Sequence, residues 1–216
     1  MYNFLKKHKL TMIIVISISL TLSISWLTST LLYTDDFYRE ILSLQLPDKT
    51  INSILETKKQ YSFFLYPISV VLEIIKYLVI TFLVATGLLI FGYKIKFKRI
   101  LKIVVISDLI LIIPSVLKIL WFNFYKTNYS LQDLQLFYPL SILNLLNTNI
   151  SNIWIYPLQL LNVFEISYWI ALAYGISKLI NNNFDKALKI VLSSYIPALV
   201  VWVVFVVFLT VTLNPA

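Results

Sequence analysis

The chain contains five apolar stretches long enough to cross a lipid bilayer, and this feature constrains its fold more than any motif does. A helix needs about 20 apolar residues to cross the hydrocarbon core, and lipid requires that every backbone group be paired internally. The predicted spans cover about residues 10–33, 64–93, 100–124, 153–180 and 187–213. The sequence therefore predicts an all-α fold, namely a polytopic membrane protein built as a bundle of five transmembrane helices.

The composition agrees with this class of protein. Hydrophobic residues make up 59% of the chain and charged residues only 13%, whereas soluble globular domains contain about a quarter charged residues. The segments between the spans are too short to form a second core. We therefore expect residues 1–216 to form a single integral membrane domain, with the lipid bilayer as its immediate partner.

The first span could also be read as a cleaved signal peptide, because Lys6, Lys7 and Lys9 form a basic segment before it. Its apolar stretch is longer than the core of a usual signal peptide, and no A-x-A cleavage site follows. These two mismatches favour an uncleaved membrane anchor.

Basic residues predict the orientation, because cytoplasmic loops carry an excess of lysine and arginine. Eleven basic residues fall on one predicted side, namely Lys6, Lys7, Lys9, Lys94, Lys96, Lys98, Arg99, Lys102, Lys178, Lys186 and Lys189. The same side carries one acid, Asp185, whereas the other side has five basic residues against six acids. We therefore expect a cytoplasmic N-terminus and an outer C-terminus. This topology accounts for the net charge of +8 without nucleic acid as a partner.

The outer side is predicted to carry short amphipathic surface helices. Two of them lie within residues 35–60, separated by Pro47, which is unfavourable inside a helix. Phe37, Ile41 and Leu44 share one helical face, as do Ile51, Ile54, Leu55 and Lys58. A third begins at a capping box of Ser130 and Asp133 and presents Leu131, Leu134 and Phe137 or Tyr138. These faces either cap the outer mouth of the bundle or form a gate or partner-docking surface.

Five ionisable residues fall inside the predicted spans, namely Glu73, Lys76, Asp108, Lys118 and Glu165. At the centre of an inserted helix each costs on the order of 3 kcal/mol, so such residues face the bundle interior or a wet cavity. Counting depth from the helix ends predicts that Glu73, Lys76, Lys118 and Glu165 meet. Asp108 is predicted to lie apart, on the same face as Ser115, with Pro114 between them kinking the helix.

The fourth span carries a polar stripe, because Gln159, Asn162 and Glu165 recur every three residues. Ala171 and Gly175 follow as a small-xxx-small pair, which permits close helix packing. The candidate intramembrane polar site thus comprises Glu73, Lys76, Asp108, Lys118, Gln159, Asn162 and Glu165. Either these residues form a structural network that fixes helix register, or they bind a proton, a cation or a polar solute. Glu165 is the single residue for which we most expect a functional role.

The residue inventory argues against catalysis and metal binding. The chain has no cysteine and a single histidine, His8, so we expect no zinc or redox-metal site and no cofactor. No H-E-x-x-H, G-x-S-x-G or Walker A motif is present. We therefore expect no catalytic residues and a protein that is not an enzyme.

Two stretches, FGYKIKFKRILKIVVISDL and LLNVFEISYWIALAYGISKLINNNFDKALKIVL, resemble the YIP (Ypt/Rab-interacting protein) family, in particular its small prokaryotic five-span members. The positions that carry the resemblance are Phe164, Trp169, Gly175, Lys178, Lys186 and Ala187. The resemblance implies a five-helix bundle with a cytoplasmic N-terminus. The chain lacks the extended N-terminal region and the D-L-Y-G-P-type motif of the eukaryotic members, which are tied to Rab-type GTPases.

These patterns leave two hypotheses about function. The first is a non-enzymatic YIP-like adaptor that organises membrane proteins or lipids, including as a structural subunit of a larger complex. The alternative is a small permease or ion-coupled carrier that uses the intramembrane carboxylates. The absence of an internal repeat, which many carriers have, favours the adaptor. The residue usage and the short basic N-terminus indicate the cytoplasmic (inner) membrane of a bacterium.

Overall fold

The structure is a computed structural model that describes residues 9–43, 46–146 and 150–213. Within these residues the fold is helical, and a single isolated β-bridge joins Ser141 to Asn162. The described residues include four helical segments that are long and apolar enough to cross a membrane, namely Leu10–Leu31, Phe64–Ile90, Phe97–Tyr125 and Phe184–Leu213. The predicted all-α, membrane-type helical architecture is therefore confirmed.

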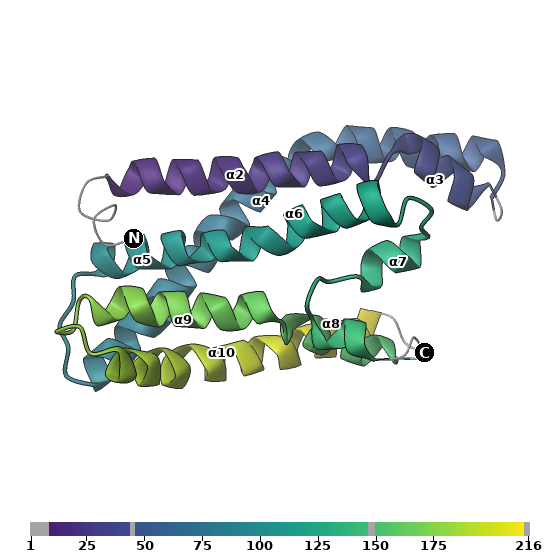
Figure 1. The fold of residues 1–216 in the computed structure, drawn as a ribbon. Coiled ribbons are helices and arrows are strands. Elements are labelled where there is room, and N and C mark those ends of the chain that lie inside the picture. The colour runs from purple at the N-terminus through teal and green to yellow at the C-terminus, as the bar shows by residue number, and fades with distance from the viewer. Residues whose placement is uncertain (1–8, 44–45, 147–149, 214–216) are drawn as a thin grey trace.

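The long helices lie side by side, with connections at the two ends of the bundle (Figure 1). The α-helices are α2 (Leu10–Leu31), α3 (Asp35–Leu42), α4 (Asp48–Ile90), α5 (Phe97–Asp108), α6 (Ile113–Leu120), α7 (Leu131–Leu136), α8 (Asn152–Leu160), α9 (Val163–Ser177) and α10 (Phe184–Leu213). The described residues also contain three short helical turns, namely η1 (Leu109–Ile112), η2 (Trp121–Tyr125) and η3 (Ile142–Leu145).

The two ends of the bundle differ in charge. The α4–α5 and α9–α10 connections lie together at one end, which we call the basic end because it carries Lys94, Lys96 and Lys178 (Figure 1). Helices α3, α7 and α8 lie at the opposite end, which we call the far end. The two basic connections thus share one end, as the charge count predicts. Lys6 and Lys7 lie outside the described residues.

Helix α4 is longer than the sequence predicts. The surface helix expected before residue 60 and the span expected from residue 64 form one helix of 43 residues, so the prediction of two separate elements is wrong. Pro47 stands at the N-cap position of α4, and no strong helix breaker follows it before Pro67. Ile51 and Leu55, which are 1% and 3% exposed, pack inward. The preceding surface helix is confirmed as α3, although Leu44 of its predicted face lies outside the described residues.

The predicted third span is helical throughout but irregular. A 3-10 turn, η1, separates α5 from α6, and the segment ends in the π-helical turn η2. Pro114 has no N–H to donate to the Ile110 carbonyl, which instead accepts the N–H of Ile113. The predicted irregularity of the helix at Pro114 is therefore confirmed, and it takes the form of the 3-10 turn that precedes the proline.

The predicted fourth span, about residues 153–180, is not one helix. It is divided into α8 and α9, and the break falls at Leu161 and Asn162. Here the backbone bonds outside the helix, because Leu161 O accepts the N–H of Ile142 at 3.0 Å and the N–H of Val163 donates to Leu140 O at 3.2 Å. Asn162 caps α9. A continuous helix at this point is a wrong prediction, and α9 alone, with 15 residues, is shorter than the usual spanning length.

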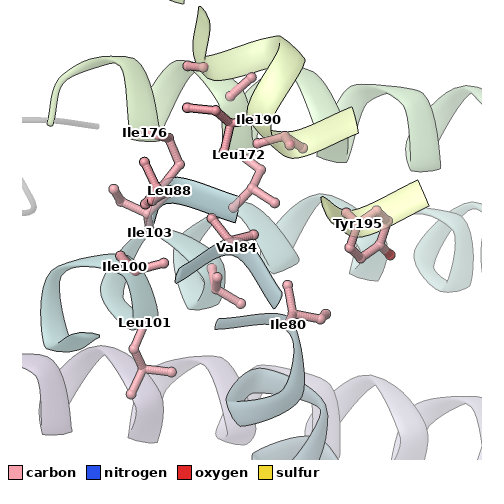
Figure 2. Close-up of a cluster of buried hydrophobic side chains, with 14 of the residues drawn as sticks. Ile80, Val84, Leu88, Ile100, Leu101, Ile103, Leu172, Ile176, Ile190 and Tyr195 are labelled. Atoms are coloured by element: carbon pink, nitrogen blue, oxygen red, sulfur yellow. The ribbon is translucent and has the colours of Figure 1, made fainter. Parts of the chain in front are cut away.

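The main apolar core lies toward the basic end, between α4, α5, α9 and α10 (Figure 2). Helices α4 and α10 approach closely at Gly87, where an added Cβ would lie 2.8 Å from Ser194 Cβ. At Gly92 the backbone has φ +83°, and the N–H of Tyr93 bonds Leu88 O at 2.8 Å. Gly92 therefore ends α4 as a glycine in the left-handed region commonly ends a helix. Gly175 is buried and Ala171 half-buried in α9.

A second, smaller core lies at the far end. Its buried members are Leu32, Ile119, Phe122 and Leu134. The capping box at the start of α7 is confirmed, because Ser130 Oγ accepts the Asp133 N–H at 3.1 Å and Asp133 Oδ2 accepts the Ser130 N–H at 2.9 Å. The apolar face of α7 thus packs against the bundle, which agrees with the interpretation of these stripes as a cap.

Candidate functional site: a polar cavity between α2, α4 and α6

A cavity of about 410 Å³ lies between α2, α4 and the α5–α6 segment. Charged and hydroxyl side chains dominate its wall, which consists of Thr21, Ile24, Ser25, Thr28, Ser29, Tyr33, Glu73, Lys76, Asp108, Leu111, Ile112 and Ser115. All three helical segments around it are among those long and apolar enough to cross a membrane. A polar cavity in such surroundings is a natural candidate for a functional site.

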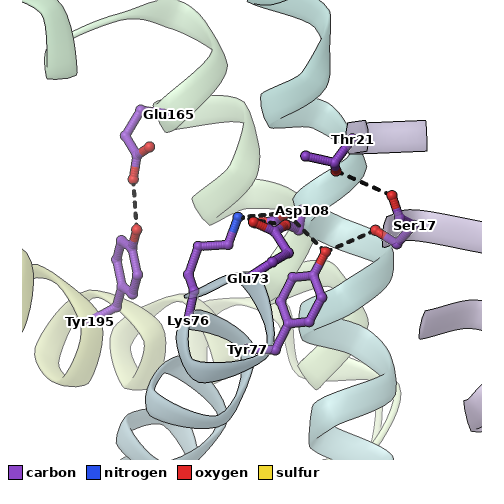
Figure 3. A network of polar contacts seen from close by, with 8 residues as sticks. All are labelled: Ser17, Thr21, Glu73, Lys76, Tyr77, Asp108, Glu165 and Tyr195. Atoms are coloured by element: carbon purple, nitrogen blue, oxygen red, sulfur yellow. Dashed lines mark hydrogen bonds and ion pairs between the residues drawn. The ribbon is translucent and has the colours of Figure 1, made fainter. Parts of the chain in front are cut away.

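Lys76 lies between two carboxylates on the wall of this cavity (Figure 3). Its Nζ donates a hydrogen bond to Asp108 Oδ2 at 2.9 Å and lies 2.9 Å from Glu73 Oε1. The contact with Glu73 is close but lacks hydrogen-bond geometry, so it is an ion pair only. The side chain of Asp108 is 2% exposed and that of Lys76 is 36% exposed. The ammonium group therefore neutralises a buried carboxylate from a position that is open to the cavity.

The prediction that Asp108 lies apart from the other charges is wrong. Depth counted along straight, upright helices places Asp108 in a different half of the bundle from Glu73. Helix α4 instead crosses the bundle obliquely (Figure 1), which brings Lys76 level with the last residue of α5. The predicted shared face of Asp108 and Ser115 is consistent with the structure, since both line the cavity.

Tyr77 and Ser17 extend the network to α2 (Figure 3). The Tyr77 hydroxyl is 3.4 Å from Asp108 Oδ2, to which it donates, and 2.9 Å from Ser17 Oγ. Both residues are 1% exposed. Our sequence reading did not single out either residue. A signal was present, because Ser17, Thr21 and Ser25 recur every four residues and therefore share one face of α2.

Asp108 keeps one carboxylate oxygen unpaired. Among the described residues, Asp108 Oδ1 is buried without a hydrogen-bond partner, as are Glu73 Oε1, Ser107 Oγ and the Tyr168 hydroxyl. Buried polar groups without a partner are uncommon in native proteins, and each requires an explanation. Asp108 and Glu73 are therefore the two residues of this cavity with an oxygen that has unused capacity to accept.

Glu165 belongs to a different cluster (Figure 3). Its Oε1 accepts hydrogen bonds from the Tyr195 hydroxyl and from Trp169 Nε1, both at 2.9 Å. It is 5% exposed and is not part of the cavity wall. The bond from Tyr195 joins α9 to α10, and the bond from Trp169 lies within α9. The prediction that Glu165 meets Glu73 and Lys76 in one cluster is therefore wrong.

The predicted polar stripe of Gln159, Asn162 and Glu165 is not a helix face, because the helix breaks within it. Asn162 Oδ1 accepts the Glu165 N–H at 2.8 Å and thereby caps α9. Gln159 Nε2 donates to Gln135 O at 2.8 Å, which ties α8 to α7. The three residues have three separate structural roles.

Lys118 also lies away from the carboxylates. Its Nζ donates to the carbonyl of Leu134 in α7. A lysine that binds a carbonyl near the end of a helix compensates the unpaired acceptors there. Of the four charges predicted to meet, only Glu73 and Lys76 form an ion pair.

The cavity offers oxygen atoms rather than the ligands of a transition metal. The described residues contain no group of three or more histidine, cysteine, aspartate or glutamate side chains that could hold a metal ion. The wall does supply two carboxylates, one ammonium group and several hydroxyls. Such a set can bind a small polar molecule or a cation, but it has no nucleophile paired with a base.

Comparisons with known proteins give no family for this chain. No family model matches it, and no curated protein and no solved structure matches it. The fold and the cavity thus define a helical membrane-type protein with a polar site among its apolar helices.

Proposed function

We propose that the chain is a non-enzymatic integral membrane protein that binds a small polar solute in the cavity between α2, α4 and α6, in the manner of a small permease or carrier. The observation that carries this proposal is the position of Lys76, which neutralises Glu73 and Asp108 on the cavity wall. Ionisable residues inside a membrane are costly, and they characteristically mark the paths of substrates and ions.

The packing of the amphipathic stripes favours this function over the adaptor. The stripes that could have served as docking surfaces are partly covered within the chain, since Ile51, Leu55 and Leu134 are at most 3% exposed, whereas Ile54 is 39% exposed. Glu73, Lys76 and Asp108, in contrast, line the cavity. The cavity is therefore the better supported candidate for a working site.

The proposal includes a five-span topology in the cytoplasmic membrane of a bacterium, with a cytoplasmic N-terminus. In this arrangement α8 and α9 together form the fourth span, which is broken at Asn162. Broken helices are tolerated at membrane depth where protein surrounds the break. The bridge between Ser141 and Asn162 supplies such cover.

The proposal is tested by measuring the unfolding temperature of the purified protein in mild detergent against a panel of amino acids, polyamines, sugars and organic acids. A ligand of the cavity should raise the unfolding temperature saturably in the wild type and not in Asp108→Asn. Glu165→Gln is a matched control, because it also replaces a buried carboxylate by an amide but lies outside the cavity wall. If a ligand stabilises all three proteins equally, the cavity is not its site.

A YIP-like membrane adaptor is a second candidate, and the surface of α10 favours it. No residue from position 196 to position 213 is buried within the described chain, and Val201, Val204 and Phe208 are more than 60% exposed. This half-helix is available to a helix of another membrane protein. Copurification from native membranes tests the candidate, because a stoichiometric partner lost in Val204→Trp but retained in Asp108→Asn would support it.

A further inference from the structure

We infer that the cavity binds a monovalent metal cation, which competes with the ammonium group of Lys76 for Glu73 and Asp108. This inference rests on the proposed function and names the class of ligand for the same site. It follows from the charge of the wall, the unpaired oxygen of Asp108, the orientation of the hydroxyls on α2 and the position of Lys76.

The ionisable residues that line the cavity lack one positive charge to be neutral in sum. Glu73 and Asp108 are the acids that line the cavity, and Lys76 is the one basic residue among the described lining residues. With all three ionised, the wall carries a net single negative charge. One monovalent cation neutralises it, whereas a divalent cation would leave an uncompensated positive charge in a low-dielectric region.

Asp108 provides the anchoring ligand. Its side chain is 2% exposed and lines the cavity, and Oδ2 accepts hydrogen bonds from Lys76 and Tyr77. Its Oδ1 is buried without a donor. A metal cation beside this atom would satisfy it, while Tyr77 continued to donate its hydrogen bond to Oδ2.

The hydroxyl groups on α2 are oriented as oxygen ligands. Thr21 Oγ1 donates its hydrogen to Ser17 O at 3.1 Å, and Thr28 Oγ1 donates to Ile24 O at 2.8 Å. Because each hydrogen is directed to the carbonyl of the same helix, the remaining lone pairs are free to accept. Carboxylate and hydroxyl oxygens suit hard cations, and the lining residues include no histidine or cysteine.

Lys76 acts as the internal competitor. Its ammonium group lies within 2.9 Å of both carboxylates, which is the place a bridging cation would take. The side chain is a flexible four-carbon stem and is 36% exposed, so it can withdraw into the cavity. The protein therefore binds the metal cation only in the fraction of molecules in which Lys76 has withdrawn, and this lowers the apparent affinity.

The test uses the full-length protein in mild detergent, with choline chloride replaced by sodium or potassium chloride at constant ionic strength. The readouts are the unfolding temperature and the binding of radioactive sodium or potassium. We expect a saturable response in the wild type, an affinity about tenfold higher in Lys76→Gln, and no response in Asp108→Asn. Lys118→Gln is the matched control, since it removes the same charge outside the cavity and should respond as the wild type does.

The outcomes separate this inference from the proposed function. If both alkali cations behave like choline in the wild type and in Lys76→Gln, the cation inference is overturned. The proposed function survives that result if a polar solute still stabilises the protein through Asp108. A Lys76→Gln protein that folds only when an alkali cation is present would support the inference. If Asp108→Asn does not fold, Ser115→Ala provides a second test, because Ser115 also lines the cavity. Ser115→Ala should weaken the cation response. An unchanged cation response in this variant would contradict the proposed site.

Discussion

At the basic end, the regular helices α4, α5, α9 and α10 enclose one large apolar cluster (Figure 2). At the far end, the same bundle contains the 3-10 turn η3, the π turn η2, the break between α8 and α9, and a small second core. The polar cavity opens between α2 and α4 on the way from the first region to the second. At the basic end, apolar packing thus holds the helices together. The rest of the bundle contains the charged groups of the cavity and the irregular backbone, which proteins tolerate where function requires them.

The largest expected effect lies in the core of the basic end. Leu172 is 0% exposed, whereas Ile170 on the same helix is 50% exposed. Leu172→Ala should lower the free energy of unfolding by about 2–5 kcal/mol because it leaves a cavity in close-packed surroundings. Ile170→Ala should change it by less than about 1 kcal/mol. Denaturant titrations in micelles measure both, and similar losses would remove the proposed difference between core and lipid-facing positions.

The next effect concerns the charges of the cavity. Lys76→Met leaves Glu73 and Asp108 without their shared counter-ion. We expect a loss of about 1–3 kcal/mol, less than for a fully buried pair, since Lys76 is partly exposed. The triple variant with Glu73→Gln and Asp108→Asn should recover most of the loss. A triple variant as unstable as Lys76→Met would show that the lysine acts through packing rather than charge.

A third substitution tests the contact between α4 and α10. Gly87→Ala places a Cβ 2.8 Å from Ser194 Cβ and 3.3 Å from Ile190 Cγ2, so the helices must separate, at a cost of about 1–3 kcal/mol. Adding Ser194→Gly removes the obstructing side chain and should restore the unfolding temperature. If the double variant is no more stable than Gly87→Ala, the close contact between α4 and α10 does not explain the loss of stability.

The smallest effect is expected at the surface of the far end. The hydrogen bonds from Lys126 and from the Ser130 N–H hold the pKa of Asp133 below its ordinary value of 3.8. Asp133 therefore stabilises the fold above pH 3.8, and this contribution is lost as the pH falls toward its lower folded-state pKa. Ser130→Ala removes one side of the capping box and should cost about 0.5–2 kcal/mol. Hydrogen exchange of the α7 amides measures both effects, and protection in α9 should not change.

The sequence predicts those features that depend on local chemistry. The long apolar segments, the capping box at Ser130 and the disturbance at Pro114 all follow from neighbouring residues, and the structure contains each of them. The break at Asn162 was missed, because its backbone partners, Leu140 and Ile142, lie some 20 residues away in the chain. Local periodicity carries no information about such partners.

The sequence predicts which residues form the candidate site, but not which of them lie together. Glu73, Lys76 and Asp108 were all identified, yet Asp108 was separated from the other two because helix tilt cannot be read from hydropathy. Glu165 and Lys118 were grouped with them by depth alone, although their hydrogen bonds are to Tyr195 and to the carbonyl of Leu134. The direction in which a side chain leaves its helix decides these contacts, and it depends on the packing of all the helices.

The length of α4 has a mechanical consequence. At about 1.5 Å per residue, its 43 residues extend over about 65 Å, twice the thickness of a hydrocarbon core of about 30 Å. The part of α4 before Pro67 is tied to α3, where Lys59 pairs with Asp35 at 3.0 Å, and the part after Pro67 carries Lys76. Pro67 lies inside α4, between these two parts of the helix. We therefore expect a displacement of the part before Pro67 to move Lys76, because one continuous helix joins the two.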